Sequence, residues 1–141
     1  MPSATRQAPT IAVFNASEDT VAFVRLFFEQ QGFHVVTQSW PAYDPLRADV
    51  ADAFVSQHAA DVVIFDVSLP YDENWQHFET FKKMLDGRKV PVVLTTTNKR
   101  ALTEMVGTTD ALEIVGKPFD LDHLASAVRN AIQRLADSSS F

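Results

Sequence analysis

Five short apolar runs, each followed by a segment in which apolar residues recur at helical spacing, make up most of the hydrophobic pattern of this chain. The runs lie at residues 10–14, 33–37, 62–66, 90–97 and 111–115, and each predicts a β-strand. The central runs are continuously apolar, which is typical of strands buried on both faces. This alternation predicts an α/β fold, a (βα)5 doubly wound parallel sheet with helices on both of its faces.

Capping residues and glycines mark the ends of the predicted helices. The expected starts are Ser17 or Asp19, Asp44 with the proline after it, Trp75, Lys99 and Asp120. The first helix is expected to end at Gly32 and the third at Gly87. Apolar spacing predicts that the second helix buries Leu46, Val50, Ala53 and Phe54.

Composition limits the class of protein. The 141 residues predict one domain at residues 10–136, between flexible ends at residues 1–9 and 137–141. A formal charge of −6 without a basic stripe argues against a nucleic-acid partner. The absence of cysteine excludes a disulfide framework and a thiol nucleophile. Because no apolar run reaches the length of a membrane span and no signal peptide is recognisable, we expect a cytoplasmic protein without a membrane partner.

Polar side chains gather where the predicted strands end. Asn15 follows the first strand, Asp66 ends the third and is followed by Ser68, Thr96 closes the fourth, and Lys117 follows the fifth. Because the carboxyl ends of parallel strands meet at one edge of a sheet, we expect these residues to face one crevice. A carboxylate, a hydroxyl and an amine there suit a phosphoryl group, with the carboxylate as nucleophile and the others as ligands of the phosphoryl oxygens.

Three motifs carry a resemblance to the receiver domains of bacterial two-component response regulators. They are the strand ending in Asp66 with Pro70 four residues later, the strand reaching Thr96, and Lys117-Pro118-Phe119. The resemblance covers residues 10–136 and implies a flavodoxin-like sheet with strand order 2-1-3-4-5.

By this resemblance Asp66 is the phosphoacceptor, Thr96 is the hydroxyl that moves onto the phosphoryl group, and Lys117 pairs with the aspartate. The backbone carbonyl of Ser68 matches a magnesium ligand. The implied function is that of a single-domain signalling protein of a phosphorelay, not an enzyme, whose output is contact with other proteins. The implied partners are a histidine kinase or phosphotransfer protein, a downstream protein, and a second copy of the chain on the face of the fourth helix, fifth strand and fifth helix.

The sequence departs from the receiver pattern at the end of the first strand, where receivers have two adjacent acids that bind Mg²⁺. Asn15 keeps an oxygen ligand without charge, and Ala16 offers no ligand. Because Mg²⁺ is usually held by carboxylates together with phosphate oxygens, we predict weak Mg²⁺ binding and slow or absent phosphorylation by small phosphodonors. Glu18 or Glu73 as a substitute ligand remains open.

A second departure is Ile114, which stands where receivers have an aromatic residue that swings inward on activation. We expect this branched aliphatic side chain to stay packed, without the usual coupling between the hydroxyl and the aromatic residue. Two alternatives remain: a phosphorylation-independent pseudo-receiver, in which Asp66 and Lys117 form a plain ion pair, and a flavodoxin-like cofactor-binding enzyme. The enzyme is disfavoured because the first strand–helix turn lacks a glycine-rich phosphate loop. The long loop with Trp40 and Tyr43 either folds over the sheet edge or binds a partner.

Overall fold

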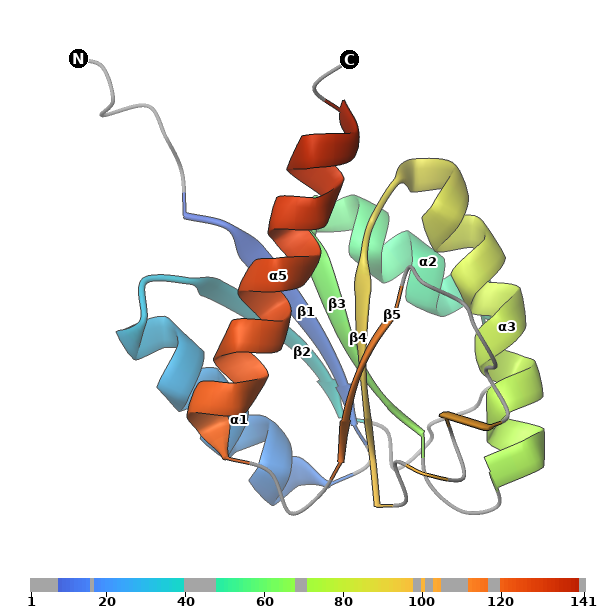
Figure 1. Ribbon diagram of the computed structural model, residues 1–141, viewed down its shortest axis with the longest axis horizontal. Coiled ribbons are helices and arrows are strands. Elements are labelled where there is room, and N and C mark those ends of the chain that lie inside the picture. The colour runs from blue at the N-terminus through green and yellow to red at the C-terminus, as the bar shows by residue number, and fades with distance from the viewer. Residues whose placement is uncertain are drawn as a thin grey trace.

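Five parallel strands form one sheet in the computed structural model, which describes residues 8–15, 17–39, 48–67, 71–97, 100, 103–104, 112–116 and 120–139. The strand order is β2-β1-β3-β4-β5, which confirms the predicted α/β fold and its flavodoxin-like order. The strands are β1 (Thr10–Asn15), β2 (His34–Ser39), β3 (Val62–Val67), β4 (Val92–Thr96) and β5 (Leu112–Gly116). Their carboxyl ends lie together at the lower edge of the sheet in Figure 1.

Two layers of helices cover the sheet (Figure 1). One layer contains α1 (Glu18–Gln30) and α5 (Leu121–Ser139), and the other contains α2 (Ala48–Gln57) and α3 (Tyr71–Arg88). Alternate side chains of the strands divide between the two layers, giving a mainly aliphatic cluster under α1 and α5 and a cluster rich in phenylalanine under α2 and α3. No helix within these ranges is long and apolar enough to cross a membrane.

Phenylalanine rings hold α3 against the centre of the sheet. Phe14 of β1 packs edge-on against Phe81 with ring centroids 5.4 Å apart, and Phe65 of β3 lies 4.8 Å from Phe78 by the same measure. All four side chains are buried. This cluster therefore supports β3 from the face opposite to α1 and α5.

The predicted caps of the first and last helices are confirmed. The Ser17 hydroxyl accepts a hydrogen bond from the Thr20 backbone N–H (3.2 Å), and the Asp120 carboxylate accepts one from the Asp122 N–H (2.7 Å). Each cap satisfies a backbone donor that has no partner within its helix.

The predicted start of α3 and the predicted buried face of α2 need correction. α3 begins at Tyr71, before Trp75, because no helix breaker separates them and an acid such as Glu73 suits a first turn. In α2 the predicted residue Phe54 packs against the core, but Ala51 and Val55 are buried and Ala53 is exposed, so the buried face is rotated slightly from the predicted one.

The termini also differ from the predicted domain boundaries. α5 continues to Ser139, three residues past the predicted end of the domain. At the other end, the Pro9 carbonyl accepts a hydrogen bond from the His34 N–H (2.9 Å), so this residue of the predicted flexible end is tied to β2. Residues 1–7, the predicted helix start at Asp44, the loop with Trp40 and Tyr43, and most of the predicted helix at 99–106 lie outside the described residues.

Three helices end in the same backbone motif, with one residue in the left-handed region just past the helix. These residues are Gly32 after α1 (φ 94°), Ala59 after α2 (φ 50°) and Lys89 after α3 (φ 59°). In each motif two N–H groups return to carbonyls of the last turn, for example from Phe33 to Phe28 (3.0 Å). Only Gly32 among these three residues is the glycine that the left-handed conformation favours. Gly87, the predicted stop of α3, lies within the helix, which ends at Arg88, and the left-handed residue is Lys89.

We expect Ala59→Gly and Lys89→Gly each to raise the free energy of unfolding by about 0.5–1 kcal/mol, because glycine removes the strain of a left-handed Cβ. Both side chains are exposed, so little packing is lost. Chemical denaturation measures the change. Gly32→Ala is the matched control and should lose about 1 kcal/mol, although space for its Cβ is open. A loss in both glycine variants would contradict this account.

An ion pair joins α2 to α3. The Arg88 guanidinium donates hydrogen bonds to both carboxylate oxygens of Asp52, at 2.7 and 2.9 Å. This bidentate hydrogen bond lowers the pKa of Asp52 below its ordinary value. A carboxyl whose pKa is lowered by folding stabilises the native state above its unfolded-state pKa, and this stabilisation is lost as the pH falls through the folded-state pKa.

We therefore expect Arg88→Gln to destabilise the protein at pH 7, with a deficit relative to wild type that shrinks as the pH falls below about 4. Urea denaturation at a series of pH values measures this deficit. Arg129→Gln is the control because Arg129 bonds to the neutral side chain of Gln31 (2.9 Å), so its deficit should not follow the pH in this way. Equal pH dependence in the two variants would refute the assignment.

Candidate functional site

A row of four side chains crosses the sheet at the carboxyl ends of its strands. In the strand register, Thr95 of β4 lies between Asp66 of β3 and Val115 of β5. Phe14 of β1 is the register partner of Phe65 of β3, so the next residues along these strands, Asn15 and Asp66, are also neighbours. The residues two positions earlier in β1, β3 and β4 belong to the cluster under α1 and α5. Because side chains two residues apart share a face, Asn15, Asp66, Thr95 and Val115 lie on the α1/α5 face.

The central contact of this row joins Asp66 to Thr95. The Thr95 hydroxyl donates a hydrogen bond to Oδ1 of Asp66 at 2.7 Å. Asp66 is 7% exposed and Thr95 is 2% exposed, so the bond is shielded from water. Burying a carboxylate costs free energy unless hydrogen bonds replace its water, and a hydroxyl bound to a carboxylate is among the stronger hydrogen bonds. Thr95 is thus a direct partner of the acid on which the site depends.

The hydroxyl predicted from the sequence, that of Thr96, lies on the other face of the sheet. Thr96 pairs with Val67 and is fully buried, one residue further along β4 than Thr95. Alternation of side chains along the strand accounts for the difference. Thr95 is identified by the register between β3 and β4, which places it opposite Asp66. The sequence of either strand alone does not reveal this register. The role of Thr96 at a phosphoryl group stays a prediction.

Asn15 supports the turn into α1. Its side-chain oxygen accepts a hydrogen bond from the Ser17 N–H (2.8 Å), and Ser17 in turn caps the helix. Asn15 is 6% exposed, so this amide oxygen is held in place by the backbone. The asparagine is therefore a local structural element of the first strand–helix turn.

The described residues do not fit a tight magnesium site. The row provides one carboxylate, whose Oδ1 accepts from Thr95, and one amide oxygen, which accepts from Ser17. Glu18 and Glu73 are exposed on α1 and α3, and no group of three or more candidate metal ligands occurs within the residues that the structure describes. Ala16, Ser68 and Lys117 lie outside these residues, as does the side chain of Ile114.

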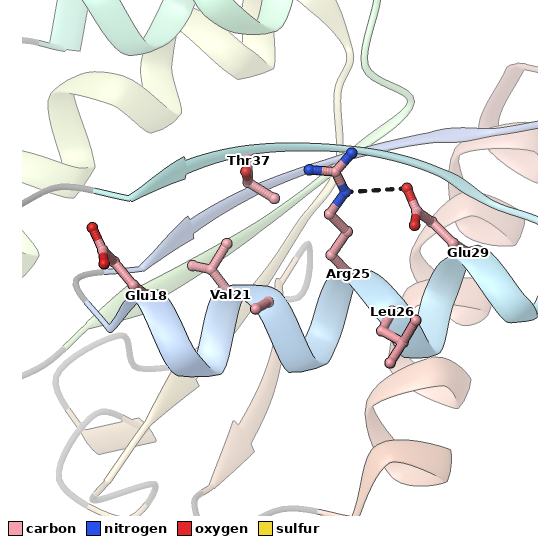
Figure 2. A pocket seen from close by; sticks show the side chains of 7 residues that line it. Glu18, Val21, Arg25, Leu26, Glu29 and Thr37 are labelled. Atoms are coloured by element: carbon pink, nitrogen blue, oxygen red, sulfur yellow. Dashed lines mark hydrogen bonds and ion pairs between the residues drawn. The ribbon is translucent and has the colours of Figure 1, made fainter.

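A separate open groove of about 470 Å³ runs between α1 and β2. Figure 2 shows its polar groups, of which Arg25 and Glu29 pair with each other at 3.1 Å, while Glu18 lies at the other end of α1. Leu26, which is 59% exposed, also lines it. Asp66 is not part of its lining, so the groove and the polar row are distinct features.

Comparison with known proteins finds likeness in structure alone. No family model and no curated protein matches the sequence. A response regulator receiver protein from Sinorhizobium medicae WSM419 superposes with a TM-score of 0.67 and 20% identity over 91% of this chain and 97% of that one. A sensor protein from Polaromonas sp. JS666 superposes with a TM-score of 0.71 and 18% identity over 90% of this chain and 98% of that one. Chemotaxis protein CheY4 of Vibrio cholerae superposes with a TM-score of 0.68 and 18% identity over 88% of this chain and 98% of that one. The chain therefore has the fold of receiver domains.

Proposed function

We propose that this protein is a receiver-type signalling domain of a two-component phosphorelay, in which Asp66 is a phosphoacceptor of reduced reactivity. The observation that supports this most directly is a buried carboxylate at the carboxyl end of a central strand, hydrogen-bonded to a hydroxyl, in a chain with the receiver fold. Ligand sites of open α/β sheets lie at this edge. The protein acts by binding other proteins, in the cytoplasm, rather than as an enzyme.

The proposed chemistry is phosphoryl transfer to a carboxylate. An oxygen of Asp66 attacks the phosphorus of a phosphohistidine on a kinase or phosphotransfer protein, an O–P bond forms, and the N–P bond breaks as the imidazole leaves. Lys117 and Thr96 are the proposed ligands of the phosphoryl oxygens, because an ammonium and a hydroxyl stabilise the charge gathered there. Thr96 would reach the phosphoryl group around the end of β4, since Thr95 occupies the face of Asp66.

The reduced reactivity proposed for Asp66 follows from the absence of two acidic magnesium ligands at the end of the first strand. With Asn15 and Ala16 in place of two acids, the charge of the transferring phosphoryl group is poorly neutralised. We therefore expect weak Mg²⁺ binding and slow phosphorylation by small phosphodonors. The proposed surface for output is formed by the fourth helix, β5 and α5, and the fourth helix lies outside the residues described here.

A second candidate is an interaction module that works without phosphate. It is favoured by the hydrogen bonds that engage Oδ1 of Asp66 and the side-chain oxygen of Asn15 within the protein itself. In this form the site would hold the domain in one conformation, and a partner protein would be the only input. The two candidates share the same fold and differ only in whether Asp66 accepts a phosphoryl group.

A phosphate mimic distinguishes the two candidates. We expect beryllofluoride with excess Mg²⁺ to shift amide NMR signals around Asp66 and Thr96, because the mimic binds to the acceptor carboxylate. Asp66→Asn should abolish these shifts. Asp61→Asn is the matched control, since Asp61 stands one residue before the same strand and its exposed carboxylate accepts a backbone hydrogen bond from Thr10 at 2.7 Å. A wild-type spectrum that does not change would exclude the phosphoacceptor and leave the phosphate-independent module.

Restoring acids to the first strand tests the magnesium argument. We expect the double change Asn15→Asp and Ala16→Asp to strengthen Mg²⁺ binding at least tenfold, measured by calorimetry, because carboxylates are the ligands that the ion prefers. The new carboxylate at position 15 can still accept the Ser17 N–H, so the turn should be kept. Glu18→Gln is the control and should leave wild-type affinity unchanged. Wild-type binding as tight as that of the double variant would refute the account.

A further inference from the structure

Thr95 is the hydrogen-bond partner of Asp66 in the polar row. We propose that its hydroxyl is a positioning group that stabilises the free carboxylate of Asp66 relative to an aspartyl phosphate, so that it slows phosphorylation and shortens the lifetime of the phosphoryl group. This inference rests on the proposed role of Asp66 as a phosphoacceptor. The hydrogen bond of 2.7 Å between Thr95 Oγ1 and Asp66 Oδ1 is the observation that carries it.

The backbone holds this hydrogen bond in place. Asp66 and Thr95 are register partners in the parallel ladder of β3 and β4, and both side chains are more than nine-tenths buried. A β-branched side chain in a strand has few χ1 rotamers, so the hydroxyl stays directed at its partner. Oδ1 is therefore the oxygen on which Thr95 acts, and in the proposed transfer the phosphoryl group goes to Oδ2.

The surroundings of Thr95 indicate that its hydroxyl serves Asp66. Two residues earlier in β4 stands Val93, and Val115 is the register partner in β5, so apolar side chains flank Thr95 along and across the sheet. A valine would fill the same space, and a buried hydroxyl costs free energy unless it forms a hydrogen bond. The Asp66 carboxylate provides that bond.

The direction of the effect follows from the charge on Oδ1. When Oδ2 attacks acetyl phosphate, an O–P bond forms, the P–O bond to acetate breaks, and acetate leaves with the electron pair. Oδ1 then becomes the carbonyl oxygen of a neutral acyl group, which accepts a hydrogen bond about half as strongly as a carboxylate does. Thr95 thus favours the unmodified state.

The same hydrogen bond assists the return step. In hydrolysis a water oxygen attacks phosphorus, the P–Oδ2 bond breaks, and Asp66 leaves as a carboxylate while inorganic phosphate is released. Negative charge builds up on the carboxyl group as this bond breaks, so the hydrogen bond from Thr95 strengthens towards the transition state. Removing the hydroxyl should therefore prolong the phosphorylated state.

The test compares Thr95→Val with wild type. Both proteins are incubated with acetyl phosphate and Mg²⁺, phosphorylated protein is quantified by intact-protein mass spectrometry, and its decay is followed after the donor is removed. We expect Thr95→Val to be labelled faster and to keep its label about fivefold longer, as expected from the loss of one charge-assisted hydrogen bond. Thr95→Ser keeps the hydroxyl and should return both rates to near wild type. Thr37→Val, the same change on the edge strand β2, should leave both rates unchanged.

The outcomes separate this inference from the proposed function. Label on Thr95→Val alone, or label that lasts longer on it, supports the inference, whereas equal or shorter lifetimes in Thr95→Val and wild type overturn it and leave Asp66 as the phosphoacceptor. If acetyl phosphate labels neither protein, beryllofluoride with Mg²⁺ replaces it as the probe: tighter binding to Thr95→Val than to wild type supports the inference, equal or weaker binding overturns it, and binding to neither protein removes the proposed function as well. Amide NMR spectra show whether each variant is folded, and Thr95→Ala replaces Thr95→Val should that variant not fold.

Discussion

Burial of three neighbouring parallel strands on both faces is the constraint on which the rest of this structure depends. β1, β3 and β4 are covered by α1 and α5 on one side and by α2 and α3 on the other. A strand covered in this way can carry polar side chains only near its ends, where water or a few hydrogen-bonding groups are within reach. Asn15, Asp66 and Thr95 lie at those ends, and each has a hydrogen-bond partner within the protein.

The aromatic face gives the polar row a fixed support. Phe65 precedes Asp66 and Val67 follows it, and both side chains enter the cluster that packs against Phe78 and Phe81 of α3. Close packing of this kind leaves little freedom for the backbone between them. Packing against α3 thus fixes the backbone of β3 at Asp66, and the hydroxyl of Thr95 fixes the carboxylate. The position of the carboxylate is therefore determined before any partner binds.

The polar row is compatible with both proposed functions, a phosphoacceptor and an interaction module that works without phosphate. A carboxylate at the end of a central strand lies at the edge where open α/β sheets bind their ligands, as the proposed phosphoacceptor requires. The hydrogen bonds from Thr95 to Asp66 and from Ser17 to Asn15 also satisfy oxygens that a metal ion or phosphoryl group would otherwise engage. The two proposals share one fold and differ in whether these internal hydrogen bonds or a phosphoryl group engages Asp66.

The sequence by itself determined the features that local signals encode. Continuous apolar runs identified the strands, Ser17 and Asp120 marked helix starts, and the acid closing the third run proved to be buried at the edge of the sheet. These follow from the chemistry of neighbouring residues along the chain. Only the tertiary structure decided that Thr95, rather than Thr96, contacts Asp66, and that α2 buries Ala51 and Val55. Which side chains meet depends on strand register and helix rotation, and both are set by packing between segments far apart in sequence.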